Sequence, residues 1–108
     1  MKNFVKIVTF VPLKDAQKVR MAMGDAGVGA KGKYSHASFT SFGVGRFKPL
    51  SGAHPAIGQV GRLEEVEEER IEVICKRSRV KRVITAIKST HPYEEVPIEI
   101  WPVEISYD

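Results

Sequence analysis

A short stretch near the C-terminal end of the chain gathers side chains that can do chemistry. Residues 90–96 have the sequence Thr-His-Pro-Tyr-Glu-Glu-Val. An imidazole nitrogen beside carboxylate oxygens suits a first-row divalent ion. Glu94 and Glu95 point to opposite faces of an extended backbone, so at most one of them joins His91, and we expect it to be Glu94. Together with the Tyr93 hydroxyl, these residue types predict a site for a metal ion or a small ligand.

A second histidine lies in a glycine-rich middle segment. His54 and His91 each precede a proline, which holds the backbone away from the helical region and stiffens it. Rigid presentation reduces the ordering entropy that opposes binding, and the glycines on either side of His54 allow this loop to approach closely. We predict that His54, His91 and Glu94 converge in one cleft at a subunit boundary. There they would ligate a divalent ion, zinc or copper, or bind a small ligand together with Tyr93.

The same residues have a plainer interpretation. Pro92 ends a helical pattern, so His91 falls at the end of a helix, where an imidazole satisfies free carbonyl groups. The two glutamates would then be solvated residues of an edge strand. The sequence leaves both interpretations open.

The charge is uneven along the chain, although the net charge is only +4. Residues 64–69 are mainly acidic and residues 76–82 mainly basic. The positive charges in the first turn of the second predicted helix are unfavourable near the positive end of its dipole, and a negative charge or solvent must compensate them. These charges belong to Arg79, Lys81 and Arg82. We expect solvent and the acidic run, in the same or a neighbouring subunit, to compensate them. A phosphate-bearing partner is the alternative.

Hydrophobic periodicity predicts four strands and two helices. The predicted strands are residues 4–11, 35–42, 69–75 and a last strand after Pro92, and Pro97 indicates that this last strand starts at or lies along a sheet edge. Apolar residues at three- and four-residue spacing predict amphipathic helices from about Leu13 and about Arg79. The glycine-rich residues 43–61 are expected to form a long loop with short strand pieces, and such a loop in a small domain is usually functional.

The two halves of the chain repeat each other. A shift of 64 residues places Ile7 on Ile71 and Val19 on Val83, and the apolar phase agrees through a strand and a helix. A repeated strand-helix-strand unit predicts an α+β fold, a βαββαβ sandwich with two helices on one face of an antiparallel sheet.

Length and composition place the chain among ordinary globular proteins. Its 108 residues predict one domain over 1–108, with 43% hydrophobic and 28% charged residues. No apolar run approaches the length of about 20 residues that spans a bilayer, and no signal peptide is expected. A lone cysteine, Cys75, excludes an internal disulfide framework. We expect a cytoplasmic protein with no membrane partner.

Several catalytic and nucleic-acid motifs are absent from the sequence. The glycines fit neither a phosphate-binding P-loop nor a dinucleotide fingerprint, and no Ser-His-Asp arrangement is indicated. Cys75 is expected to be a buried, inert thiol. Phe39 and Phe42 offer aromatic rings, but the RNP pattern is missing, so nucleic acid is not an expected partner.

Motifs spread over nearly the whole chain resemble a known domain. They are Phe10-Val11-Pro12, Gly43-Val44-Gly45-Arg46-Phe47-Lys48-Pro49, Gly52-Ala53-His54-Pro55-Ala56-Ile57-Gly58, Gly61-Arg62-Leu63-Glu64, Glu69-Arg70-Ile71-Glu72 and His91-Pro92-Tyr93-Glu94-Glu95. Together they resemble a stand-alone YqfO-type domain of the Nif-three-like family. The resemblance implies a ferredoxin-like fold similar to CutA and PII proteins, and a homotrimer.

The resemblance also bears on function. It implies a small CutA/PII-like regulatory or homeostasis protein that binds a divalent metal ion or a small ligand at a subunit interface, with no catalysis of its own. The larger Nif-three-like proteins carry a dinuclear metal centre, whose ligands lie outside this domain. A metal-assisted hydrolase is therefore the first alternative, and a nucleic-acid-binding module is the second.

Overall fold

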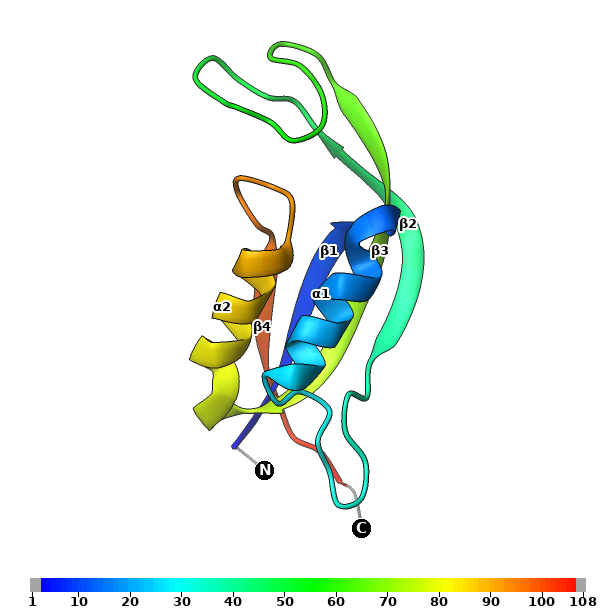
Figure 1. The fold of residues 1–108 in the computed structure, drawn as a ribbon, viewed down its shortest axis with the longest axis vertical. Helices are drawn as coiled ribbons and strands as arrows, with labels where there is room; N and C mark the ends of the chain where they lie inside the picture. Colours follow the sequence, from blue (N-terminus) through cyan, green and yellow to red (C-terminus); the bar gives the residue numbers. More distant parts are fainter. Residues whose placement is uncertain (1–2, 107–108) are drawn as a thin grey trace.

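The computed structural model of the chain describes residues 3–106. Four strands form one antiparallel sheet, and both helices cover the same face of it (Figure 1). The elements are β1 (Phe4–Pro12), α1 (Leu13–Asp25), β2 (Phe39–Phe47), β3 (Glu64–Lys76), a short 3₁₀ helix (Arg77–Arg79), α2 (Val80–Thr90) and β4 (Ile98–Val103). The predicted α+β, ferredoxin-like βαββαβ sandwich is confirmed.

The sheet has the strand order β2-β3-β1-β4. Ile7 on β1 pairs with Val73 on β3 and with Ile100 on β4, so the two halves of the chain interlock at the centre of the sheet. Strand β4 lies at the edge and begins directly after Pro97, as the proline predicted. No helix within residues 3–106 has the length and apolar character needed to cross a bilayer.

The core lies between the sheet and the two helices. Alternate residues of β1 and β3 face it, because successive side chains of a strand point to opposite faces. Both helices contribute the apolar stripes expected from their periodicity. The core members include Val5, Ile7, Val11, Val19, Met23, Ile71, Val73, Val83 and Ile87. Cys75 is buried among them, and burial raises the pKa of its thiol, which suits an inert role.

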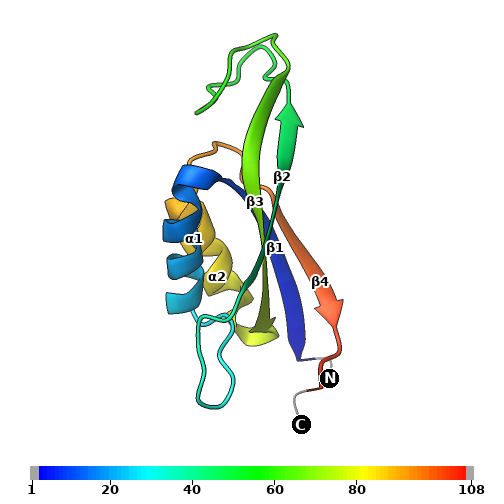
Figure 2. The ribbon, with the colours of Figure 1, turned by 90° about the vertical axis from the view of Figure 1, so that its right-hand side faces the viewer.

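The two helices lie side by side on one sheet face, as the internal repeat predicted, and they run in opposite directions (Figure 2). The end of α1 therefore meets the start of α2. Arg79 Nη1 donates to the carbonyl of Gly27 at 3.0 Å, and Arg82 Nε donates to that of Ala26 at 3.2 Å. These carbonyls are the negative end of α1, so they compensate the two arginines. The acidic run instead pairs with Arg20 and Arg46.

The bounds of β2 differ from the prediction of residues 35–42. His36 has a positive φ of 62°, which is incompatible with a continuous strand, so β2 begins only at Phe39. The ring of His36 binds Ser35 Oγ through Nδ1 and Asp25 Oδ1 through Nε2, each at 2.9 Å. This exposed Ser-His-Asp chain, which the sequence did not indicate, anchors the loop to the end of α1.

The glycine-rich segment is a strand for its first part. Strand β2 continues to Phe47, and β3 begins at Glu64 rather than at Glu69. The two strands form a long hairpin that rises beyond the helices, and the molecule measures 50 × 22 × 21 Å (Figure 1). The remaining residues 48–63, here named the arm loop, close the hairpin at its far end.

A candidate ligand-binding cleft

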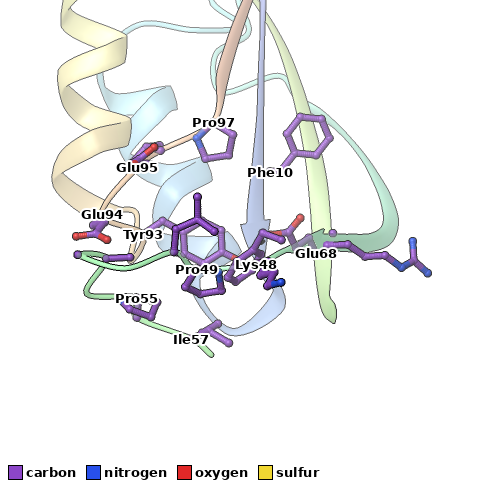
Figure 3. Close-up of a pocket in the computed structure, with 18 of the residues that line it drawn as sticks. Phe10, Lys48, Pro49, Pro55, Ile57, Glu68, Tyr93, Glu94, Glu95 and Pro97 are labelled. Atoms are coloured by element: carbon purple, nitrogen blue, oxygen red, sulfur yellow. Dashed lines mark hydrogen bonds between the residues drawn. The ribbon is translucent and has the colours of Figure 1, made fainter. Parts of the chain in front are cut away.

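A cleft of about 1110 Å³ lies between the arm loop and the segment that joins α2 to β4. This joining segment, residues 91–97, contributes Tyr93 and Glu94, while Pro49 and Pro55 come from the arm loop (Figure 3). The lining consists of residues 45–53 and 55–57, residues 93–97, Phe10 and Glu68. Two hydrogen bonds from the joining segment position these two parts of the chain.

The first hydrogen bond joins Tyr93 to Glu68. The Tyr93 hydroxyl donates to Glu68 Oε2 at 2.7 Å, and the residue Glu68 is only 9% exposed. Burial, with the Glu68 carboxylate as acceptor, raises the pKa of Tyr93 well above its usual range, so this phenol stays protonated as the donor. A side chain on Gly45 would put Cβ 2.1 Å from Glu68 Oε1, so any other residue there would displace the carboxylate from this position.

The ring of Tyr93 also packs against the end of β2. It meets the Phe47 ring edge-on, with 5.9 Å between centroids. This is a favourable aromatic geometry. The Tyr93 side chain therefore connects the joining segment to both strands of the hairpin.

The second hydrogen bond joins Glu94 to the arm loop. Glu94 Oε1 accepts the backbone N–H of His54 at 2.8 Å. The structure thus brings these two predicted site residues together, but through the backbone of His54. The His54 side chain is exposed and does not line the cleft.

His91 occupies the helix end that the sequence predicted. It follows α2 directly in an extended conformation and is 7% exposed. Its Nε2 hydrogen bonds the Phe10 carbonyl at 2.7 Å, and its Nδ1 accepts the Tyr93 N–H at 3.1 Å. Because a carbonyl only accepts, Nε2 carries the proton and the ring is neutral. Burial also lowers the pKa of His91.

The three predicted metal ligands have different environments. Both ring nitrogens of His91 are engaged in hydrogen bonds, and the Glu94 carboxylate accepts a hydrogen bond from the backbone N–H of His54. The His54 side chain is exposed. Among residues 3–106, no group of three or more His, Cys, Asp and Glu side chains is arranged to hold a metal ion. Binding of zinc or copper by these residues stays a prediction. The structure shows a role for His91 and Tyr93 in positioning the cleft wall.

Sequence reasoning missed Glu68 as a cleft residue. Glu68 belongs to an acidic run, and such runs are usually solvated. The available signal was Gly45, because a glycine inside a strand often marks a close approach, and in the structure it is Glu68 that packs against it. Phe47 and Lys48 also line the cleft and lay in the segment that we had predicted as functional.

Comparison with known proteins gives a clear result, although no family model matches the chain. A Bacillus subtilis protein described as GTP cyclohydrolase 1 type 2 homolog is 50% identical over 99 residues, which are 92% of this chain and 26% of that protein. A Mycobacterium tuberculosis protein of the same description is 42% identical over 96 residues, 89% of this chain and 25% of that protein. A solved Bacillus cereus protein related to NIF3 is 44% identical with a TM-score of 0.83, over 96% of this chain and 26% of that chain.

The resemblance to the Nif-three-like family is confirmed. This chain is similar to one domain of those proteins, since it spans about a quarter of the length of the curated relatives that it matches. Their activity as whole proteins is a separate question from what this domain does.

More distant structures share the fold. The divalent cation tolerance protein CutA from Archaeoglobus fulgidus has a TM-score of 0.69 at 15% identity, over 96% of this chain and 87% of that one. Arabidopsis thaliana PII, solved with citrate bound, has a TM-score of 0.62 at 19% identity, over 95% of this chain and 77% of that one. The predicted CutA/PII-like architecture is therefore confirmed as a fold.

Proposed function

We propose that this Nif-three-like domain is a regulatory or homeostasis module that binds a small ligand in the cleft between the arm loop and residues 91–97. The observation that supports it most is the cleft itself, whose volume of about 1110 Å³ is slightly above the upper end of the usual range for ligand sites. Its walls are mainly apolar, and a few polar groups are held in place by hydrogen bonds. Such a wall binds a ligand without first paying to become ordered.

The arrangement favours binding over catalysis. Each of the conspicuous polar groups has a structural partner: Tyr93 has Glu68, Glu94 has the arm loop, and His91 has β1. A ligand in the cleft would contact both the arm loop and the joining segment, so its binding would change how tightly the arm is held. Coupling between ligand occupancy of the cleft and the position of the arm loop is the basis of regulation in this proposal.

A divalent metal ion remains the second ligand candidate for this cleft. The A. fulgidus neighbour is named for divalent cation tolerance, and Glu68, Glu94 and Glu95 supply carboxylate oxygens to the lining. Zinc or copper calorimetry on the wild type and on His91→Ala tests the predicted ligand set. Equal binding by both proteins would remove His91 from that set.

We also propose that the module works as a homotrimer, as the resemblance implies. Strand β4 is the last strand in the sheet order, and Trp101 and Ile100 on it are 50% and 44% exposed. Exposed aromatic and aliphatic side chains on an unpaired strand edge are suited to contact another copy of the chain. A cleft whose walls include an extended hairpin would then lie near a subunit boundary.

Hydrolysis is the alternative function, because the curated relatives carry GTP cyclohydrolase in their name. The assay is turnover of GTP by this chain with added zinc, followed against a blank without protein. Turnover that disappears in Glu68→Gln would favour the hydrolase. A nucleic-acid module is the remaining alternative, and binding that falls steeply with salt but keeps sequence preference would support it.

The test of the main proposal maps binding onto the cleft. Backbone amide NMR spectra are recorded with a panel of cationic, neutral and anionic small molecules, with zinc among them. A ligand should shift amides of the arm loop and of residues 93–97. Ala56→Trp, which places an indole at the cleft wall, should abolish the effect, and Ala30→Trp, at an exposed alanine outside this lining, should not. A panel without any shift at the cleft would contradict the proposal.

A further inference from the structure

Glu68 is an unusual residue in the cleft wall. The residue is only 9% exposed, yet its carboxylate forms no ion pair within residues 3–106. One oxygen, Oε2, accepts the Tyr93 hydroxyl, and the other, Oε1, lies beside Gly45 in the cleft wall. A mostly buried carboxylate without a counter-charge is costly. The cleft therefore offers a negative charge that a ligand can compensate.

The basic residues of the lining do not neutralise this charge. Arg46 belongs to the lining, but its guanidinium pairs with the exposed Glu65 at 3.5 Å. Lys48 lines the cleft but is exposed and forms no ion pair in the described part of the chain. Glu94 and Glu95 add two further carboxylates to the lining. The cleft thus favours a cation.

The rest of the lining indicates what kind of cation. Pro49, Pro55, Ile57, Val96 and Pro97 offer apolar contacts, as Figure 3 shows for several of them. The rings of Tyr93 and Phe47 meet edge-on beside the Glu68 carboxylate. Aromatic rings with a carboxylate attract an ammonium group, and apolar walls attract a hydrocarbon body. An inorganic ion would leave those walls without a partner.

We propose that the cleft recognises a small organic ammonium ion, with its charged head at Glu68 Oε1 and an apolar body against the arm loop. This inference rests on the proposed ligand-binding function and specifies the chemical class of the ligand. Tyr93 acts as a positioning residue, since its hydroxyl fixes one carboxylate oxygen and leaves the other for the ligand. Gly45 leaves the room in which this carboxylate lies.

The experiment compares three probes of similar shape on the full chain. Benzylamine is a cation at neutral pH, benzyl alcohol is neutral and benzoate is an anion. Each is titrated while backbone amides are followed by NMR. Benzylamine should bind at least about tenfold more tightly than the other two, because only the ammonium gains from the buried carboxylate. Its shifts should fall on residues 93–97 and the arm loop.

Matched variants distinguish the effect of the Glu68 carboxylate on binding from the effect of any nearby negative charge. Glu68→Gln keeps an acceptor for Tyr93 and should weaken benzylamine about tenfold without affecting benzyl alcohol. Glu67→Gln removes an exposed carboxylate of the same strand that lies outside the lining and forms no ion pair within residues 3–106, and it should change nothing. Lys48→Met removes a competing ammonium and should leave benzylamine binding equal or tighter. If Glu68→Gln fails to fold, the relative affinities of the wild type for the three probes test the inference on their own.

Three outcomes would overturn the inference. The first is benzoate or benzyl alcohol binding as tightly as benzylamine, and the second is Glu68→Gln binding benzylamine as well as the wild type does. The third is that none of the three probes binds. The broader function would still be judged separately, because an anion or a metal ion from the larger panel could occupy the cleft.

Discussion

His91 is the first residue of the joining segment, and its two ring nitrogens hydrogen bond the Phe10 carbonyl of β1 and the backbone N–H of Tyr93. Burial lowers its pKa, against smaller opposing effects of the Phe10 carbonyl and the Glu68 and Asp15 carboxylates. The unfolded chain therefore binds a proton more readily than the folded chain does. The stability that the neutral ring contributes is present above the unfolded pKa of about 6.5 and is lost as the pH falls from there through the lower folded pKa.

This linkage gives the first prediction. The free energy of unfolding should fall more between about pH 7.5 and about pH 5.5 in the wild type than in His91→Gln, which cannot titrate. Urea unfolding at the two pH values measures the difference. His54→Gln, at an exposed histidine, is the control and should keep the slope of the wild type. Identical slopes in the wild type and His91→Gln would show that the buried ring is not the source.

The second prediction concerns the hydroxyl of Tyr93. Tyr93→Phe leaves Glu68 Oε2 without its donor in a mostly buried position. The expected loss is about 1–3 kcal/mol of unfolding free energy. Tyr34→Phe, at a hydroxyl on an 80% exposed residue, should be neutral within about 0.5 kcal/mol. Denaturant unfolding of both variants checks this, and equal effects of the two would contradict the role given to Tyr93.

For single residues, the sequence predicted which segment lines the cleft better than it predicted the role of each side chain. Of the conspicuous residues 91–95, only residues 93–95 line the cleft, and a ligand site there stays a prediction. The sequence did not show that the nitrogens of His91 are occupied, because their partners, Phe10 and the Tyr93 amide, depend on the fold. Glu68 was hidden in an acidic run, since burial of one glutamate among several cannot be recognised from charge alone.

Among the elements, the loop between α1 and β2 depends on one close backbone approach. Gly29 donates its N–H to the Ile74 carbonyl at 2.9 Å and has φ of 64°. A Cβ there would lie 2.2 Å from the backbone nitrogen of Ala37. Gly32 has a similar φ of 57°, but a Cβ there would meet nothing within 4 Å. An alanine at Gly32 would therefore introduce backbone strain alone, whereas an alanine at Gly29 would add a steric clash.

The third prediction uses this pair. Gly32→Ala should cost about 1 kcal/mol, the strain of a left-handed alanine. Gly29→Ala should cost about 3 kcal/mol, because two backbone segments must also move apart. Thermal or urea unfolding gives both values. Equal destabilisation by the two variants would mean that the loop has room at Gly29.

The elements themselves were largely predictable. The periodicity of both helices and the 64-residue repeat predicted two helices on one sheet face, as observed. The second and third strands were placed less well. Gly43, Gly45 and the glutamates of β3 have low strand propensity, and long-range pairing in the hairpin overrides it. The left-handed His36 that delays β2 has no signal in the hydrophobic pattern.

For the whole molecule, the fourth prediction concerns assembly. Trp101 is 50% exposed in the single chain, and its indole N–H donates to Glu99 within β4. In the proposed trimer, a second copy would cover this ring. Trp101→Ala should then weaken association by about 3 kcal/mol per site, the usual cost of truncating a buried interface aromatic. Sedimentation at micromolar concentration should show a trimer for the wild type and dissociation for Trp101→Ala.

A control variant tests whether the loss of any exposed aromatic ring weakens the trimer. Tyr34→Ala removes an exposed aromatic ring from the loop before β2, far along the chain from β4, and should leave the trimer intact. A wild type that sediments as a monomer would end the trimer proposal. A trimer that Trp101→Ala does not weaken would place the interface elsewhere.

The central claim is that the chain is a ligand-binding module that assembles as a trimer. Native mass spectrometry of protein purified without chelator tests this most directly, because it reports the oligomer and the bound species together. We predict a trimer that carries additional small-molecule mass, and loss of that mass in Ala56→Trp but not in Ala30→Trp. A monomer with the bare mass of the chain, or additional mass that Ala56→Trp retains in full, would contradict the claim.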